Sequence, residues 1–257
     1  MSSKSLAFLE LLKSHLESKA KNNDRKYDYF HPSEFSDCVR KITYLHMGEI
    51  GNNKISGDLQ RVFDNGHGMH HRYAEYLSDM GLAYGVWKCR NPLCGEEYGK
   101  GELLGIPKRE DPCDKCGCSD YSYEEVQVFS EEYMFKGHVD GIFKLADEFY
   151  VVDYKSMFSF QFKKLSGPLE KHVIQLTIYI WLLDLKSGFL LYENKDDQKI
   201  KMFEVTRNEK LIESIKKRAK KLMHVLDEDL LPKRPYANKN DKHCKRCPFR
   251  TMCWKDN

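Results

Sequence analysis

Residues 149–156, FYVVDYKS, combine the composition of a buried strand with two oppositely charged side chains. Five of the first six residues are aromatic or β-branched, which favours a strand packed inside the protein. Side chains alternate along a strand, so Asp153 and Lys155 point to the same face. An acid and a base placed in this way form a structural ion pair or take part in chemistry, and for an isolated pair the structural explanation is the more common one.

A second acid is expected beside this pair. The segment 133–143, YMFKGHVDGIF, contains Asp140. A short turn joins this segment to the strand over 149–156, which predicts a hairpin. Two carboxylates held together repel each other unless a cation lies between them, and oxygen ligands suit Mg²⁺ or Mn²⁺. The side chain of Tyr154 points to the opposite face, but its backbone carbonyl can reach the site. Beside a cation, Lys155 can orient or activate water, or stabilise charge that builds on a phosphate.

The rest of the chain alternates between helical and strand patterns, which predicts a mixed α/β (α+β) fold. The N-terminal segment has the leucine stripe of an amphipathic helix. The expected elements are that helix with Leu6, Leu9, Leu12 and Leu16 on one face, a helix beginning near Ser33 or Ser36, a helix over 58–80, a largely buried helix over 169–187, strands over 188–193 and 199–205, and an amphipathic helix over 208–231.

The order Asp140, then Asp153-Tyr154-Lys155, resembles the P-D-(D/E)-x-K nuclease core. The surrounding segments are similar to its RecB-like branch, which includes the CRISPR-associated iron–sulfur exonucleases. The resemblance implies a restriction-endonuclease-like core, in which helices flank a central mixed β-sheet. It runs from about residue 33 to the end of the chain, so residues 1–257 are expected to form a single RecB-like nuclease domain.

Two helical motifs extend the resemblance. Gly66-His67-Gly68-Met69-His70 resembles a G-x-x-x-H motif whose histidine is a metal ligand; His71 is the alternative, and either could be an ordinary surface or packing histidine. Gln175 and Tyr179 match a Q-x-x-x-Y motif, and their spacing puts both on one helix face, near the active site or the DNA, unless they only pack in a core helix. The resemblance implies that the ligands of Mg²⁺ or Mn²⁺ are His70, Asp140, Asp153 and the carbonyl of Tyr154, and that the catalytic set is Asp140, Asp153, Lys155, Gln175 and Tyr179.

The C-terminal segment 241–257 contains three cysteines with the spacing C-x2-C-x5-C, namely Cys244, Cys247 and Cys253. In a reducing compartment, clustered cysteines indicate metal ligands before disulfides, and three thiolates leave a tetrahedral site one ligand short. Residues 33–44, SEFSDCVRKITY, resemble the segment that supplies a remote fourth cysteine in iron–sulfur members of the branch. The resemblance implies that Cys38 joins the other three to hold a [4Fe–4S] cluster, which would staple the two ends of the chain together. A zinc ion with His243 as fourth ligand is the alternative.

Residues 88–121 are rich in Cys, Gly, Pro and charge, and they contain little periodicity. Cys89-x4-Cys94 and Cys113-x2-Cys116 form two knuckles close to a zinc-ribbon pattern, with Cys118 as an alternative to Cys116. A segment so poor in apolar residues needs a metal ion to fold, so we expect Zn²⁺ in an embedded insertion. The insertion could guide DNA or only support the fold.

Composition suits a soluble protein and leaves the partner open. The 257 residues carry a net charge of +3, too small to prove a nucleic-acid partner. No apolar run approaches the roughly 20 residues that span a bilayer, and the first residues do not resemble a secretion signal, so a cytoplasmic protein without a membrane partner is expected. A DNA backbone could be tracked by lysines and arginines of 163–164, 216–221 and 242–250, although such charge runs are more often solvated surface. Phe158, Phe160 and Phe162 could stack on bases or belong to the core.

Taken together, the motifs predict a metal-dependent DNA exonuclease. The resemblance implies single-stranded DNA cut from an end, most readily from 5′ to 3′, in repair, recombination or replication. One alternative is a structure-specific or flap endonuclease that works in a larger complex with protein partners that the sequence does not identify. Another is a non-catalytic, metal-stapled DNA-binding module, for which a broken acid–lysine set would be expected, whereas this set is intact.

Overall fold

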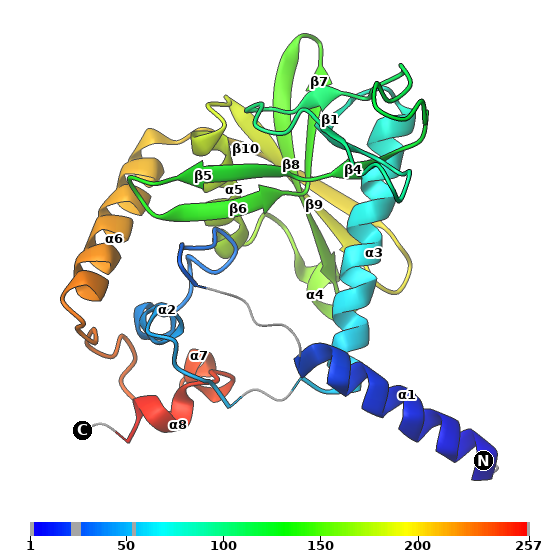
Figure 1. Cartoon of the computed structure of the whole chain (residues 1–257). Coiled ribbons are helices and arrows are strands. Elements are labelled where there is room, and N and C mark those ends of the chain that lie inside the picture. The colour runs from blue at the N-terminus through cyan, green and yellow to red at the C-terminus, as the bar shows by residue number, and fades with distance from the viewer. Residues whose placement is uncertain (1–2, 22–26, 53–54, 256–257) are drawn as a thin grey trace. The chain divides into compact units, whose positions relative to one another are not determined.

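The computed structural model describes residues 3–21, 27–52 and 55–255 (Figure 1). The chain forms two compact units, and we describe each by itself. The terminal unit comprises Met1–Asp28, Asp37–Gly68 and Lys221–Asn257, and the sheet unit comprises Tyr29–Ser36 and Met69–Lys220. Across the described residues, no helix has both the length and the apolar character to cross a bilayer.

The sheet unit is built on an eight-stranded mixed sheet whose main order is β10-β9-β8-β7-β1-β2, while β3 and β4 also pair with β1. Strands β8 and β9 run parallel, and the other paired strands are antiparallel. A second sheet pairs β5 with β6. The strands are β1 Ala83–Cys89, β2 Glu97–Tyr98, β3 Ile106–Pro107, β4 Tyr121–Glu124, β5 Val126–Ser130, β6 Phe135–Val139, β7 Gly141–Leu145, β8 Glu148–Met157, β9 Ser187–Asn194 and β10 Ile200–Thr206.

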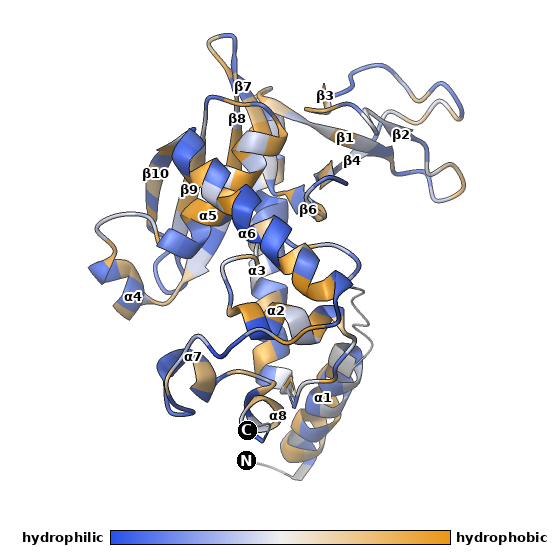
Figure 2. Ribbon diagram, turned by 90° about the vertical axis from the view of Figure 1, so that its left-hand side faces the viewer, coloured by the Kyte–Doolittle hydropathy of each residue, from blue (hydrophilic) through white to orange (hydrophobic). Residues whose placement is uncertain are grey.

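Helices flank the central sheet, which confirms the mixed α/β class expected from the sequence. They are α3 Gly57–Asp79, α4 Ser159–Lys164, α5 Glu170–Leu182 and α6 Glu209–Asp227. Helix α5 packs against β8 and β9, and its residues from Gln175 to Ile180 are all buried. Its ribbon is largely orange in Figure 2, whereas α6 alternates between polar and apolar colours. The long apolar run expected over 169–187 is therefore a shorter core helix followed by a turn and the start of β9.

The main core lies between α5 and the face of the sheet that it covers. Val151 of β8 and Leu190 of β9 are fully buried there, together with Leu176 of α5. Apolar burial of this kind stabilises each large side chain by about 1.5–3 kcal/mol. The core therefore fixes β8, the strand that carries Asp153 and Lys155, at the centre of the fold.

Asp140 does not lie inside a strand. The sequence predicted one strand through 133–143, but the structure divides it into β6 and β7, with Asp140 at the junction. β6 pairs with β5, whereas β7 pairs with β8 and β1. The chain therefore changes sheets at Asp140, which leaves this side chain at a break between two ladders.

The cysteine-rich insertion is the connection of a hairpin. Strands β1 and β4 pair antiparallel, with Cys89 opposite Tyr121, and the insertion leaves and re-enters the sheet between them. The sequence had suggested no strand at β1. That strand is buried at Ala83, Val86, Trp87 and Cys89. Ala83, Trp87 and Cys89 pack in one apolar cluster with Cys113 and Tyr121, so β1 supplies the core against which the insertion folds.

The terminal unit contains α1 Ser3–Lys21, α2 Val39–His46, α7 Lys242–Lys245 and α8 Arg250–Cys253. The predicted helix start near Ser33 or Ser36 is wrong, because residues 32–36 form turns and α2 begins after Cys38. Buried Arg40 of α2 donates hydrogen bonds to the carbonyl of Pro232 and to the hydroxyl of Tyr44. The contact with Pro232 joins α2 to the segment that follows α6.

Helix α1 is present where the leucine stripe predicted it, but it is only weakly buried. Leu12 and Leu16 are half-buried, while Leu6 and Leu9 are exposed. The Cβ of Leu16 lies 3.3 Å from the position that a Cβ would take at Gly57. Only the end of the stripe that includes Leu16 therefore packs closely within the terminal unit.

Candidate active site and metal centres

Asp140 and β8 are joined by a buried hydrogen bond. The backbone N–H of Tyr154 donates to Oδ2 of Asp140 at 2.7 Å, and the Asp140 side chain is 10% exposed. The ring of Tyr154 stacks on Tyr73 of α3, with centroids 4.7 Å apart. The predicted proximity of Asp140 to the Asp153–Lys155 strand is therefore present in the structure, through the backbone of the residue between them.

Asp153 is fully buried, and protein groups contact both of its carboxylate oxygens. Gln175 of α5 donates to Oδ1 at 2.8 Å, and Nζ of Lys155 lies 2.7 Å from Oδ2. Gln175 also donates to the hydroxyl of Tyr179 at 3.3 Å. Four of the residues that the sequence singled out, Asp153, Lys155, Gln175 and Tyr179, thus form one contact network.

The environment of this network shifts the pKa values of its members. Burial raises the pKa of Asp140 above its ordinary value, and the charge of Asp153 raises it further. Burial lowers the pKa of Lys155, but the carboxylates of Asp153 and Asp140 outweigh that effect and the net shift is upward. Lys155 is therefore a stable cation beside two acids, and its side chain is 21% exposed.

His70 of α3 lies on the side of Asp140 away from its bond to Tyr154. Its Nδ1 is 3.4 Å from Oδ1 of Asp140 and 3.9 Å from Oε1 of Glu125. The ligand atoms of these three residues all lie within 4.8 Å of one another. The structure therefore brings together His70 and Asp140 of the predicted ligand set, adds Glu125, and leaves the carboxylate of Asp153 outside this group.

Glu125 is the residue that sequence reasoning missed. It follows Glu124 in the segment YSYEEVQV and belongs to none of the motifs recognised above. In the sequence, β5, a turn and β6 lie between Glu125 and Asp140. Only the pairing of these strands brings it to the site.

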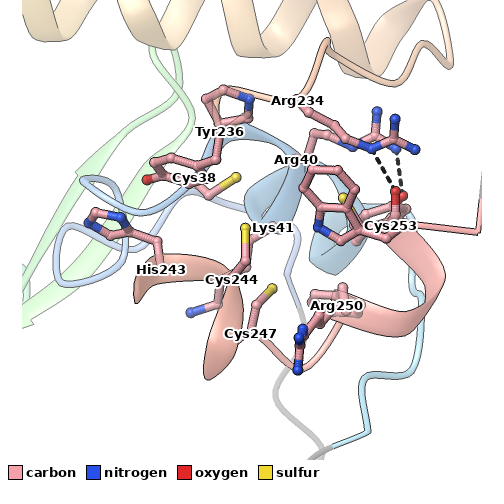
Figure 3. A pocket seen from close by; sticks show the side chains of 14 residues that line it. Cys38, Arg40, Lys41, Arg234, Tyr236, His243, Cys244, Cys247, Arg250 and Cys253 are labelled. Carbon is pink, nitrogen blue, oxygen red and sulfur yellow. Dashed lines mark hydrogen bonds between the residues drawn. The ribbon is translucent and has the colours of Figure 1, made fainter. Parts of the chain in front are cut away.

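The four cysteines predicted for the cluster line one cavity of the terminal unit (Figure 3). Their sulfur atoms face a common space, which also borders on Arg40, Arg234 and Trp254. Arg234 Nε donates to the carbonyl of Cys253 at 2.8 Å. Tyr44 and Phe249 also line the cavity, and their stacked rings have centroids 5.2 Å apart.

The spacing of these sulfurs distinguishes two kinds of metal group. A single zinc ion with bonds of 2.3 Å requires sulfurs about 3.8 Å apart. Among the described residues, Cys38, Cys244, Cys247 and Cys253 do not form a group with all ligand atoms within 4.8 Å. His243, the alternative zinc ligand, hydrogen-bonds to Asp241 at 2.8 Å and stacks on Tyr236. Four cysteine thiolates around this cavity fit a metal centre held by cysteines.

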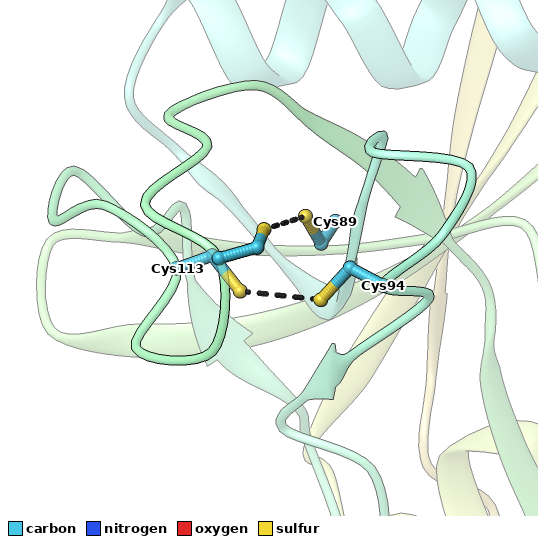
Figure 4. A group of neighbouring side chains, drawn as sticks. Cys89, Cys94 and Cys113 are labelled. Carbon is cyan, nitrogen blue, oxygen red and sulfur yellow. Dashed lines mark hydrogen bonds between the residues drawn. The ribbon is translucent and has the colours of Figure 1, made fainter.

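The insertion holds a second, tighter cysteine group (Figure 4). Sγ of Cys89 lies 3.5 Å from that of Cys116, and Sγ of Cys94 lies 3.6 Å from that of Cys113. All four sulfurs lie within 4.8 Å of one another. These separations match the edges of a tetrahedral zinc site, so this four-cysteine group fits a metal ion without rearrangement.

Local chemistry shapes the two knuckles. Gly95 and Gly117 directly follow a cysteine of each knuckle and have φ of 62° and 72°, which favours glycine. The hydroxyl of Tyr98 donates to Sγ of Cys113 at 3.3 Å, which lowers the pKa of that thiol and favours the thiolate that metals bind.

Cys118 stands apart from the group, because its sulfur interacts with the backbone of Asp120. Of the two candidates that the sequence left open, the structure brings Cys116 to the other three cysteines.

Comparison with known proteins agrees with this architecture. The family model described as the PD-(D/E)XK nuclease superfamily matches residues 101–254. The chain belongs to the PD-(D/E)XK nuclease superfamily. The matched residues include Asp140, Asp153, Lys155 and the three C-terminal cysteines, whereas Cys38 and His70 precede them. No curated protein sequence matches the chain.

Solved structures of similar fold accompany this family match. The structure of SSO0001 is 17% identical, with a TM-score of 0.53 and coverage of 96% of both chains, so the likeness concerns the fold alone. An alkaline exonuclease, LHK-Exo from Laribacter hongkongensis, is 12% identical at a TM-score of 0.45 and covers 84% of this chain and 93% of its own. Its complex with dAMP has a TM-score of 0.47 at 12% identity and covers 79% and 90%. Both of these TM-scores are below 0.5.

Proposed function

We propose that this PD-(D/E)XK protein is a metal-dependent DNA exonuclease that degrades single-stranded DNA from an end, in the 5′-to-3′ direction, in DNA repair, recombination or replication. The observation that carries the proposal is the buried network in which Asp153 contacts both Lys155 and Gln175, while Asp140 is hydrogen-bonded to the same strand. A merely structural Asp–Lys pair would not require a second buried acid nearby. The direction of cutting rests on the resemblance to the RecB-like branch.

His70, Asp140, Asp153 and the carbonyl of Tyr154 would hold the Mg²⁺ or Mn²⁺ ion. The donor chemistry fits, because carboxylate and carbonyl oxygens suit both ions and imidazole suits transition metals. Burial and the nearby charge of Asp153 both raise the pKa of Asp140. A cation bound at this site would therefore stabilise the ionised carboxylate. When bound, such an ion supplies Lewis-acid polarisation of a phosphate oxygen and a more acidic water.

Lys155 would donate a hydrogen bond to the phosphate on which charge develops. Its raised pKa keeps it protonated, so it is poorly suited to remove a proton from water. Its side chain remains partly exposed, whereas that of Asp153 is fully buried. Asp153 would thus hold the ammonium group in place, and Lys155 would present it to the substrate.

Gln175 and Tyr179 would act as positioning residues. They are only 5% and 3% exposed, which argues against direct contact with DNA. The amide of Gln175 fixes one oxygen of Asp153, and the hydroxyl of Tyr179 accepts from that amide. Their contribution would be to hold Asp153 in one orientation.

The segment after β8 supports single-stranded DNA as the substrate. Phe158 and Phe160 are 56% and 70% exposed, whereas Phe162 is 5% exposed and belongs to the core. The ammonium groups of Lys195 and Lys164 lie 5.1 Å and 4.0 Å from the ring centroids of Phe158 and Phe160. Exposed rings beside lysines are the combination that stacks on unpaired bases and neutralises their phosphates.

The cysteine groups would serve stability. Cys38, Cys244, Cys247 and Cys253 would hold a [4Fe–4S] cluster that ties α2 to the C-terminal segment. Cys89, Cys94, Cys113 and Cys116 would hold Zn²⁺ and order the insertion. Neither role requires redox chemistry.

The test is degradation of end-labelled linear single-stranded DNA in Mn²⁺ by the whole protein and by Asp153→Ala and Lys155→Ala. We expect Asp153→Ala to be inactive and Lys155→Ala to lose about 100- to 1,000-fold, the typical cost of removing one group that stabilises transition-state charge. Asp147→Ala and Lys186→Ala are matched controls, because these side chains are 96% and 84% exposed.

DNA substrates of different form distinguish an exonuclease from an endonuclease. Resistance of closed circular single strands, with products released from the 5′ end, supports the exonuclease. Cutting of closed circles or of flap junctions would instead identify an endonuclease. Equal activity of the wild type and both site variants would overturn the catalytic assignment.

A further inference from the structure

Glu125 occupies the same kind of position as Asp140. It lies between β4 and β5, where the chain stops pairing with β1 and begins to pair with β6. The β5–β6 ladder ends with Val126 opposite Val139, and Glu125 and Asp140 are the residues next to this last pair. Two acids therefore lie near each other at the point where both strands leave the small sheet.

This arrangement is unfavourable without a positive charge. Ligand atoms of Glu125 and Asp140 lie within 4.8 Å of each other, and two carboxylates held so close repel each other. Among the described residues, no lysine or arginine forms an ion pair with Glu125, and Lys155 contacts Asp153 instead. The group that faces both acids is the imidazole of His70.

The ligand atoms of His70, Glu125 and Asp140 lie within 4.8 Å of one another. Oδ2 of Asp140 already accepts from Tyr154, whereas Oδ1 accepts no hydrogen bond from the described part of the protein and faces Nδ1 of His70. Oε1 of Glu125 faces the same nitrogen. Asp140 is 9% exposed, whereas the side chain of Glu125 is 40% exposed. Solvent can therefore reach these ligand atoms from the side of Glu125.

We infer that Glu125 is a direct ligand of a divalent cation, which it holds together with His70 and Oδ1 of Asp140. The inference rests on the proposed function in taking His70 and Asp140 as metal ligands, and it adds a carboxylate that no motif predicts. Two carboxylate oxygens and one imidazole nitrogen favour Mn²⁺ over Ca²⁺, which prefers oxygen ligands alone.

The test measures Mn²⁺ binding rather than activity. Free Mn²⁺ is quantified by electron paramagnetic resonance during titration of the full chain, without DNA. We expect Glu125→Gln to weaken Mn²⁺ binding about 10- to 100-fold, because losing a ligand should cost at least as much as losing an outer partner of a metal site. Glu124→Gln is the matched control: it makes the same charge change at the adjacent, exposed residue and should bind Mn²⁺ like the wild type.

Each outcome decides the matter. Weaker binding by Glu125→Gln with unchanged Glu124→Gln supports the inference, even if no variant degrades DNA, in which case only the proposed function fails. Equal binding by Glu125→Gln and wild type overturns it, whatever the activity. A wild type that binds no Mn²⁺ also overturns it. Should Glu125→Gln fail to fold, Glu125→Asp keeps the charge but shortens the reach, and it should still bind Mn²⁺ more weakly than the wild type.

Discussion

The two four-cysteine groups of this protein differ in how their sulfurs are brought together. One group, for which we propose zinc and which we call the zinc-type group, comes from the insertion and consists of Cys89, Cys94, Cys113 and Cys116. Its sulfurs all lie within 4.8 Å of one another. The other group, for which we propose a cluster and which we call the cluster-type group, takes Cys38 from the position just before α2. Its other members, Cys244, Cys247 and Cys253, come from the C-terminal segment, and the four residues line a cavity. Knuckle spacing sets the first arrangement locally, whereas the second depends on packing between distant segments. The difference teaches that four cysteines can be gathered either within one insertion or by the packing of distant segments, and that the sulfur separations then differ.

The largest expected effect is on the cluster-type group. Cys244→Ser should abolish iron binding and the brown colour of anaerobically purified protein, because a [4Fe–4S] cluster needs its four thiolates. His243→Ala should keep both, since His243 is engaged with Asp241 and Tyr236. Metal analysis of each variant provides the measurement. Colourless wild-type protein that contains zinc but no iron would remove the distinction between the two groups.

The next effect concerns the choice between Cys116 and Cys118. Structural zinc sites have apparent binding free energies of about 10–16 kcal/mol, or roughly 3 kcal/mol per ligand, so Cys116→Ser should weaken zinc binding about 100-fold. Cys118→Ser should bind zinc like the wild type, because its sulfur lies outside the group. Competition with a chromophoric chelator measures both affinities. The reverse ranking would show that the knuckle uses Cys118.

The smallest effect comes from a group that touches the zinc-type site without being a ligand. Tyr98→Phe removes the hydrogen bond to Cys113 and leaves the N–H of Asp114 without its acceptor. We expect zinc affinity to fall about tenfold, the lower end of the range for outer partners of metal sites. Tyr121→Phe is a control, since that hydroxyl bonds to the carbonyl of Asp111 rather than to a sulfur. A drop equal to that of Cys116→Ser would mean that the variant unfolds the insertion.

Sequence motifs identified most of the residues that the structure brings together at the acidic site. Asp153, Lys155, Gln175 and Tyr179 are joined by contacts, as their alternation on a strand and their spacing on a helix suggested. The sequence predicts one continuous strand through Asp140, because Val139 and Ile142 are β-branched and the change of partner strand between them has no local pattern. Glu125 matches no motif, since it comes near Asp140 only through the pairing of β5 with β6.

The sequence by itself determined the local patterns: the apolar strand with its acid and lysine, the paired cysteine knuckles, and the periodic helices. These depend on residues close in the chain, whose spacing alone places side chains on one face or around one ion. Tertiary structure alone decided where β6 ends and β7 begins, which acid faces His70, and how widely the four cluster-type cysteines are spread. Those features depend on strand pairing and packing between distant segments, and no local pattern of residues encodes such distances.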